Sequence, residues 1–383
     1  MQKQPSVLTL SFLHALGKGF SVFYFILLTV FYARGQISNA RIGYIGALFI
    51  LFVIAGAGLV AHWLHRHTTR SVLIFSAIIA VFVNTLLLLN VATLSHQLLY
   101  VIYALMGLAI GTSMSGANAV AARITKKGER FHALAKLGML TDIVRIALPI
   151  AVASGLAIGS LESVVASIVL LSLLFLLASL RIPNFESAKI SKQQSKSKIL
   201  ANSQFRFILS IEFLDSFSSS QLFVFLPVLF LAKGFTIQNS LLLQSAIFLG
   251  YLSGRWLIGF FASRHSGEKA VAWAEIGLVL SILLLLLAQT NYTLYLLSYL
   301  LGIFARGTSP AIKALSFDSL SEAQMKRGSA LHVVAGDSGS MLGQLVFGLL
   351  LAWLGVEAPF LLAAGVSTII ALLLVGNSRT SRS

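Results

Sequence analysis

Two carboxylic acids, Glu212 and Asp215, stand three residues apart in an apolar stretch and have the chemistry needed to exchange protons. Residues three apart on a helix share one face, so their carboxyl groups would lie side by side. Two acids in a poorly hydrated place resist being ionised together, and such a pair can load and release a proton. We predict that both acids bind protons reversibly, the alternative being a static ion-pair cluster between helices.

Asp142 and Arg145 are also three apart, in a second apolar stretch that reaches Pro149. A local pair of opposite charges is the cheapest way to keep either charge inside such a segment. The pair is either static or a gate, which opens when Asp142 takes up a proton or an anionic substrate competes for Arg145. Asp142 is thus a further candidate proton site, and Arg145 a candidate substrate ligand.

Asp337 lies in a third apolar stretch, and Ser340 stands where the preceding pair has its arginine. Asp337 must then be protonated or find a basic partner in another part of the chain, and Arg306, Arg255 and His332 are the candidates. We predict that Asp337 is a proton site and that both arginines line the same cavity. A hydrogen bond from Asp337 to a neighbouring helix is the alternative.

His14 and Lys18 are four apart and would share one helical face. We predict that they form a basic wall of a substrate cavity, suited to an anionic or zwitterionic substrate unless nearby acids neutralise them. Lys313, Asp318 and Glu275 are expected near helix ends, where they would reach the interface as gate or anchor residues.

The elements that must position these charges are membrane-spanning helices. The chain has 383 residues, of which 57% are hydrophobic and 10% charged, and its mean hydropathy is +0.90, which is more apolar than a soluble domain. About twelve apolar segments are long enough to cross a bilayer. They are residues 7–32, 42–61, 72–89, 98–122, 133–155, 163–180, 207–231, 241–262, 270–288, 294–315, 330–354 and 359–375.

Basic residues mark one side of this membrane arrangement. Lysines and arginines gather in alternate loops, whereas the opposite loops hold only Arg34, Arg41 and Lys233. The positive-inside rule therefore places both termini in the cytoplasm. The net charge of +16 follows from this loop bias and not from a folded basic patch, so we expect a lipid bilayer and no nucleic acid as partner.

An internal repeat divides the chain. Gly111-Thr112-Ser113 is followed by a basic stretch and then by Asp142, and Gly307-Thr308-Ser309 by a basic stretch and then by Asp337. A polar segment at 183–205 separates the copies, which predicts halves at 1–182 and 206–383 joined by a cytoplasmic linker. Repeated halves in a membrane chain are typical of secondary transporters.

The segment 259–269 resembles the loop motif between the second and third helices of each half in the major facilitator superfamily. Residues 58–66 resemble its first-half copy, although His62 and Ser263 stand where that family has an aspartate. The resemblance implies that these loops are cytoplasmic gates, with Gly259, Arg264, Gly267, Gly58 and Arg66 as their candidate residues.

The resemblance implies an all-α integral membrane fold of about twelve transmembrane helices in two pseudo-symmetric six-helix halves. It also implies alternating access, a bacterial inner membrane, a monomer, no cofactor, and proton-coupled export of a small organic solute. Import of an amino acid, nucleoside or metal chelate is the alternative within this class. A transporter-like receptor or a lipid-acting membrane protein is the alternative outside it.

His62, His65 and His67 are close enough in sequence to suggest zinc or nickel binding, but no carboxylate or thiolate nearby completes a site. We expect these histidines to anchor the interface and predict no bound metal. The chain also lacks zincin, phosphate-loop and nucleophile-elbow motifs, so we expect no enzyme.

Overall fold

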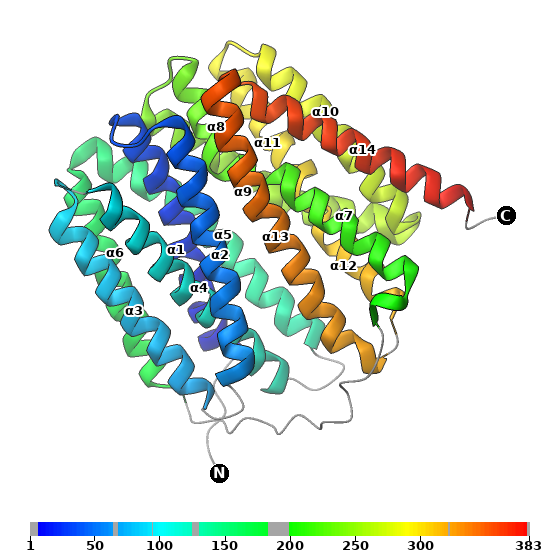
Figure 1. Ribbon diagram of the computed structural model, residues 1–383, viewed down its shortest axis with the longest axis horizontal. Coiled ribbons are helices and arrows are strands. Elements are labelled where there is room, and N and C mark those ends of the chain that lie inside the picture. The colour runs from blue at the N-terminus through cyan, green and yellow to red at the C-terminus, as the bar shows by residue number, and fades with distance from the viewer. Residues whose placement is uncertain are drawn as a thin grey trace. The chain divides into compact units, whose positions relative to one another are not determined.

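The computed structural model is all-helical and describes residues 7–63, 68–93, 95–124, 130–182, 199–320 and 322–380 (Figure 1). The α-helices of the first part are α1 (Val7–Ala33), α2 (Asn39–Trp63), α3 (Thr69–Asn90), α4 (His96–Ile124), α5 (Arg130–Ile158) and α6 (Leu161–Leu180). Those of the second part are α7 (Ser203–Ser219), α8 (Gln221–Ala232), α9 (Ile237–Arg264), α10 (Gly267–Leu287), α11 (Asn291–Gly307), α12 (Ser309–Asp318), α13 (Glu322–Leu354) and α14 (Ala358–Thr380).

Among the described residues, 11 helical segments are long and apolar enough to cross a membrane. The helices α7 and α8 form one of these segments, Ser203–Ala232. The pair α11 and α12 corresponds to the predicted span at 294–315, so the prediction of about twelve spans is confirmed.

The tenth predicted span is broken in the middle. The helix α11 ends at Gly307, and α12 begins at Ser309 with Pro310 in its first turn. Proline has no backbone N–H and cannot continue the hydrogen-bond ladder across the junction. Thr308 therefore lies at a helix junction, where its side chain makes no capping hydrogen bond.

The packing divides the chain into two units, Met1–Leu28 with Leu48–Ile190, and Thr29–Ala47 with Ser191–Ser383. Within the first unit, a Cβ on Gly56 of α2 would lie 2.5 Å from the backbone oxygen of Leu108 on α4. Within the second unit, a Cβ on Gly254 of α9 would come even closer to the backbone oxygen of Ile303 on α11. Equivalent helices of the repeat thus make the same glycine-mediated contact.

A buried aromatic group stabilises the first unit. The hydroxyl of Tyr24 donates to Oδ1 of Asn84 at 2.9 Å, and the hydroxyl of Tyr103 donates to the Tyr24 carbonyl at 2.7 Å. The Tyr24 ring packs edge-on against Tyr103 and is stacked with Phe49. These contacts connect α1 with α2, α3 and α4.

The second unit places α7 against α13, and α10 beside α14 (Figure 1). Gly339 of α13 approaches the backbone of Phe213, and Gly343 approaches Ser220. The two glycines are four residues apart, and small residues at this spacing let membrane helices pack closely. The charged face of α7 is thereby held next to α13.

Candidate proton and substrate site

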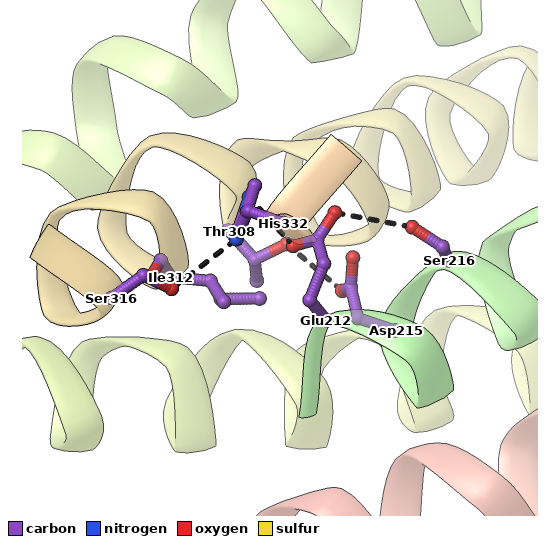
Figure 2. Close-up of polar contacts among 7 residues, drawn as sticks. All are labelled: Glu212, Asp215, Ser216, Thr308, Ile312, Ser316 and His332. Atoms are coloured by element: carbon purple, nitrogen blue, oxygen red, sulfur yellow. Dashed lines mark hydrogen bonds and ion pairs between the residues drawn. The ribbon is translucent and has the colours of Figure 1, made fainter. Parts of the chain in front are cut away.

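Glu212 lies at the centre of a polar cluster in the second unit (Figure 2). Its carboxylate is 3.3 Å from Nε2 of His332 on α13, and its other oxygen accepts a hydrogen bond from Ser216 at 3.3 Å. On the far side of the imidazole, Nδ1 of His332 is 3.2 Å from Oγ of Ser316 on α12. Glu212 is 5% exposed and His332 4%, so water does not screen this contact.

Asp215 lies one turn further along α7 and has no exposed surface. The hydroxyl of Thr308, at the junction of α11 and α12, makes no helix-capping hydrogen bond and instead donates to Oδ1 of Asp215 at 3.0 Å. Arg306 lies close enough to interact electrostatically with both Asp215 and Glu212. The predicted side-by-side placement of the two acids is confirmed. Their contacts come from Ser216 on α7, from Thr308 at the junction of α11 and α12, and from His332 on α13.

Glu275 was expected at a helix end, and this prediction is wrong. It lies inside α10 with no exposed surface, and its carboxyl group is within hydrogen-bonding reach of Asp215. Sequence reasoning missed it because α10 begins at Gly267, two turns before it. A single acid within an otherwise apolar span was the signal that could have identified it.

Three other charged residues of the second half that the sequence singled out are Asp337, Lys313 and Arg255. Asp337 is half-buried on α13 and close enough to Glu212 for their charges to interact. Lys313 on α12 interacts electrostatically with Glu212 and His332, so it also belongs to the cluster. Arg255 is half-buried on α9. Arg306 interacts with Glu212 and Asp215, and its pairing with Asp337 stays a prediction.

The first unit contains the basic counterpart. Nη1 of Arg145 lies 3.3 Å from Oδ1 of Asp142, which confirms the predicted local pair on α5. His14 lies close enough to Lys18 and Arg145 for both cations to act on its ring. The structure thus brings together three of the predicted substrate-cavity residues, together with the buried Asp142, within one unit.

The serines that follow Asp215 pack between helices. Ser216, Ser218 and Ser220 are at most 1% exposed. Ser340 of α13 donates to the Ser216 carbonyl at 3.3 Å, and Gln344 donates to the Ser220 carbonyl at 2.7 Å. These side-chain hydrogen bonds connect α13 to the backbone of α7 and of Ser220 at its C-terminal end.

The candidate gate loop of the second half joins α9 to α10. The guanidinium of Arg264 lies 4.1 Å from the centre of the Phe260 ring, and Gly267 packs against Leu315 of α12. A Cβ added at Gly259 would meet no described neighbour within 4 Å, and the same holds for Gly58 in the first half. Both positions therefore have room for a larger side chain.

Three residues singled out in the sequence, Arg66, His65 and His67, lie outside the described residues, as does the side chain of His62. Within the described ranges, no group of three or more histidine, aspartate or glutamate side chains could hold a metal ion.

Comparison with known proteins assigns the chain to a family. The sequence profile of the Major Facilitator Superfamily matches residues 7–243 and 208–383. No curated protein sequence matches the chain significantly. Among solved structures, a mutant of the nucleoside transporter NupG is 14% identical with a TM-score of 0.81, and covers 97% of this chain and 99% of its own.

Two further solved structures have the same fold. A POT family transporter in complex with 5-aminolevulinic acid is 14% identical with a TM-score of 0.77, over 98% of this chain and 96% of its own. A D-xylose-proton symporter is 16% identical with a TM-score of 0.72, over 96% of each chain. The twelve-span fold and the full-length profile match agree, and the chain therefore belongs to the Major Facilitator Superfamily of multi-pass membrane transporters.

Proposed function

We propose that the chain is a proton-coupled secondary transporter that exports a small organic solute across the cytoplasmic membrane by alternating access. The observation that carries this proposal is the buried contact between Glu212 and His332 inside a cluster of acids. An ionisable group at membrane depth is costly and marks a functional pathway more often than a structural one.

The hydrogen bonds around His332 support reversible protonation of Glu212. Ser316 Oγ lies 3.1 Å from the Ile312 carbonyl and 3.2 Å from Nδ1 of His332. When Ser316 donates to Ile312, it accepts from Nδ1–H, so that Nε2 can accept from a protonated Glu212. When Ser316 donates to Nδ1, the Nε2–H group faces an ionised Glu212. The two arrangements differ by one proton, which is the change that a coupling site requires.

The remaining candidates take their roles from charge. Asp215, Asp337 and Asp142 join Glu212 as proton-coupling acids. The cations that could bind an anionic or zwitterionic part of the solute are His14, Lys18, Arg145, Arg306 and Arg255. The pairing of Asp142 with Arg145 at 3.3 Å supports a gate, because protonation of Asp142 would release the arginine for substrate.

Orientation and direction complete the proposal. The basic loops support cytoplasmic termini in a bacterial inner membrane, and the loops at Gly58–Arg66 and Gly259–Gly267 would then act as cytoplasmic gates. Export rests on a resemblance to bacterial exporters. The short loops carry it, together with the spans that contain Asp142 in the first half and Glu212 and Asp215 in the second. Two halves at 1–182 and 206–383 would rock about the linker.

Flux into proteoliposomes tests the proposal. A nucleoside, an amino acid, a metal chelate and several amphipathic drugs would be tested as solutes under an imposed proton gradient. We expect one of them to move against the proton flow, and Glu212→Gln to abolish gradient-driven movement while solute still binds. Glu357→Gln, at an exposed position between α13 and α14, is the matched control.

Solute that moves with the protons would identify an importer. Unchanged gradient-driven flux in both Glu212→Gln and Asp337→Asn would show that these acids are structural and would overturn the mechanism.

A further inference from the structure

We propose that Asp215 and Glu275 form a carboxyl–carboxylate pair that binds a single proton between α7 and α10. The pair extends the proposed function, on which it rests, because it supplies a proton site separate from the contact between Glu212 and His332. Neither the repeat nor the loop motifs point to Glu275.

Three carboxyl oxygens of this pair have no donor among the described residues. Both residues are 0% exposed. Asp215 Oδ1 accepts from Thr308, but Oδ2 of Asp215 and both oxygens of Glu275 are buried without a hydrogen-bond donor. Buried acceptors left unmatched are costly, so a group that donates to them is expected.

The apolar packing below the two acids holds them together. Ile211 precedes Asp215 by one turn, and Val271 precedes Glu275 by one turn. Both apolar residues belong to one buried cluster, together with Ile312 of α12. The helices α7 and α10 both pack against α12 and α14. The two carboxyl groups therefore lie in the same layer, where they are within hydrogen-bonding reach of each other.

A proton is what lets these groups bind each other. Two carboxylates are both acceptors, so they repel, whereas a protonated carboxyl has one O–H that it can donate. A single proton converts the contact into a charge-assisted O–H···O⁻ hydrogen bond, which is short and strong. It also leaves one negative charge instead of two on groups that have no exposed surface.

The surrounding charges are consistent with one bound proton. On α11, Arg306 interacts with Asp215 and with Glu212. The other charged or titratable groups near these acids are Glu212 on α7, Lys313 on α12, and His332 and Asp337 on α13. On α14, Ser367 lies close to Glu275, and its hydroxyl donates to Oγ of Ser218 at 3.4 Å. The acids thus outnumber the two permanent cations, and one shared proton reduces this excess.

The direct contact favours a proton over a sodium ion. A metal cation coordinated by both carboxyl groups would hold their oxygens apart, whereas a shared proton draws them together. Thr308 could then couple a conformational change of the transporter to proton binding by the pair, because it lies at the junction of α11 and α12. Movement at this junction would change the only donor to Asp215 Oδ1 among the described hydrogen bonds.

Infrared spectroscopy of the purified full chain tests the pair. Protonated carboxyl groups give a C=O stretching band that shifts in D₂O and disappears as pH rises. We expect such a band in the wild type near neutral pH. We expect Glu275→Gln to remove or shift it, Asp215→Asn to shift it, and Asp318→Asn to leave it unchanged, with each variant checked for monodispersity and thermal unfolding.

Absence of this band from the folded wild type would overturn the proposal without the need for any variant. A band unaffected by both Glu275→Gln and Asp215→Asn would overturn it too, as would loss of the band on adding sodium chloride but not choline chloride. A band that depends on Glu275 in a protein whose flux ignores the proton gradient would support the pair and refute the proposed function. Proton-driven flux without the band would refute the pair alone.

Discussion

Replacing Thr308 by valine should shift the pH dependence of transport. Valine keeps the shape of threonine but lacks the hydroxyl that donates to Asp215 Oδ1 at 3.0 Å. Asp215 is 0% exposed, so water cannot replace the donor. A hydrogen bond to a charged group contributes about 1.5–3 kcal/mol.

The sign of the shift follows from which form of Asp215 the hydroxyl stabilises. An O–H donor favours the carboxylate, and its loss favours the protonated form. Because one pH unit corresponds to about 1.4 kcal/mol, the lost hydrogen bond predicts an alkaline displacement of roughly one to two units. The protonated state would then persist at a pH where the wild type has already released its proton.

The assay is solute flux in proteoliposomes, measured over a range of equal internal and external pH values. Thr308→Ser is the matched control, because it keeps the hydroxyl and loses only a methyl group. We expect the serine variant to follow the wild-type profile. Identical profiles for the valine and serine variants would refute the argument that this hydrogen bond governs proton release.

Three further predictions concern stability, measured by thermal unfolding in detergent. Gly302→Ala places a Cβ against the backbone oxygen of Ile247 on α9 and should destabilise the fold by about 1–3 kcal/mol. Gly365→Ala is the control, because a Cβ there meets nothing within 4 Å, and equal melting temperatures for the two variants would contradict the close contact. Tyr24→Phe leaves a buried amide without its donor and should cost about 1–3 kcal/mol, and an unchanged melting temperature would show that the bond is not needed. Arg145→Ala removes the cation that pairs with the buried Asp142 and should cost about 3–5 kcal/mol. The double variant with Asp142→Asn should recover part of that loss, and no recovery would argue against the pair.

Helical geometry explains which parts of the site the sequence predicted. Glu212 with Asp215, and Asp142 with Arg145, are three apart, and a helix places such residues on one face whatever surrounds it. The membrane class and the positions of the spans followed from apolar length alone. The broken tenth span was missed because the apolar pattern continues across Pro310.

The sequence by itself determined that the chain crosses a membrane about twelve times, as a repeat with acids inside its spans, because composition and short-range spacing carry that information. Only the tertiary structure decided that Glu212 lies next to His332, that Thr308 donates to Asp215, and that Glu275 faces Asp215. These partners come from α10, from the junction of α11 and α12, and from α13, far apart in the sequence. Their meeting depends on which helices pack together and how each is rotated, and such long-range contacts leave no local pattern in the sequence.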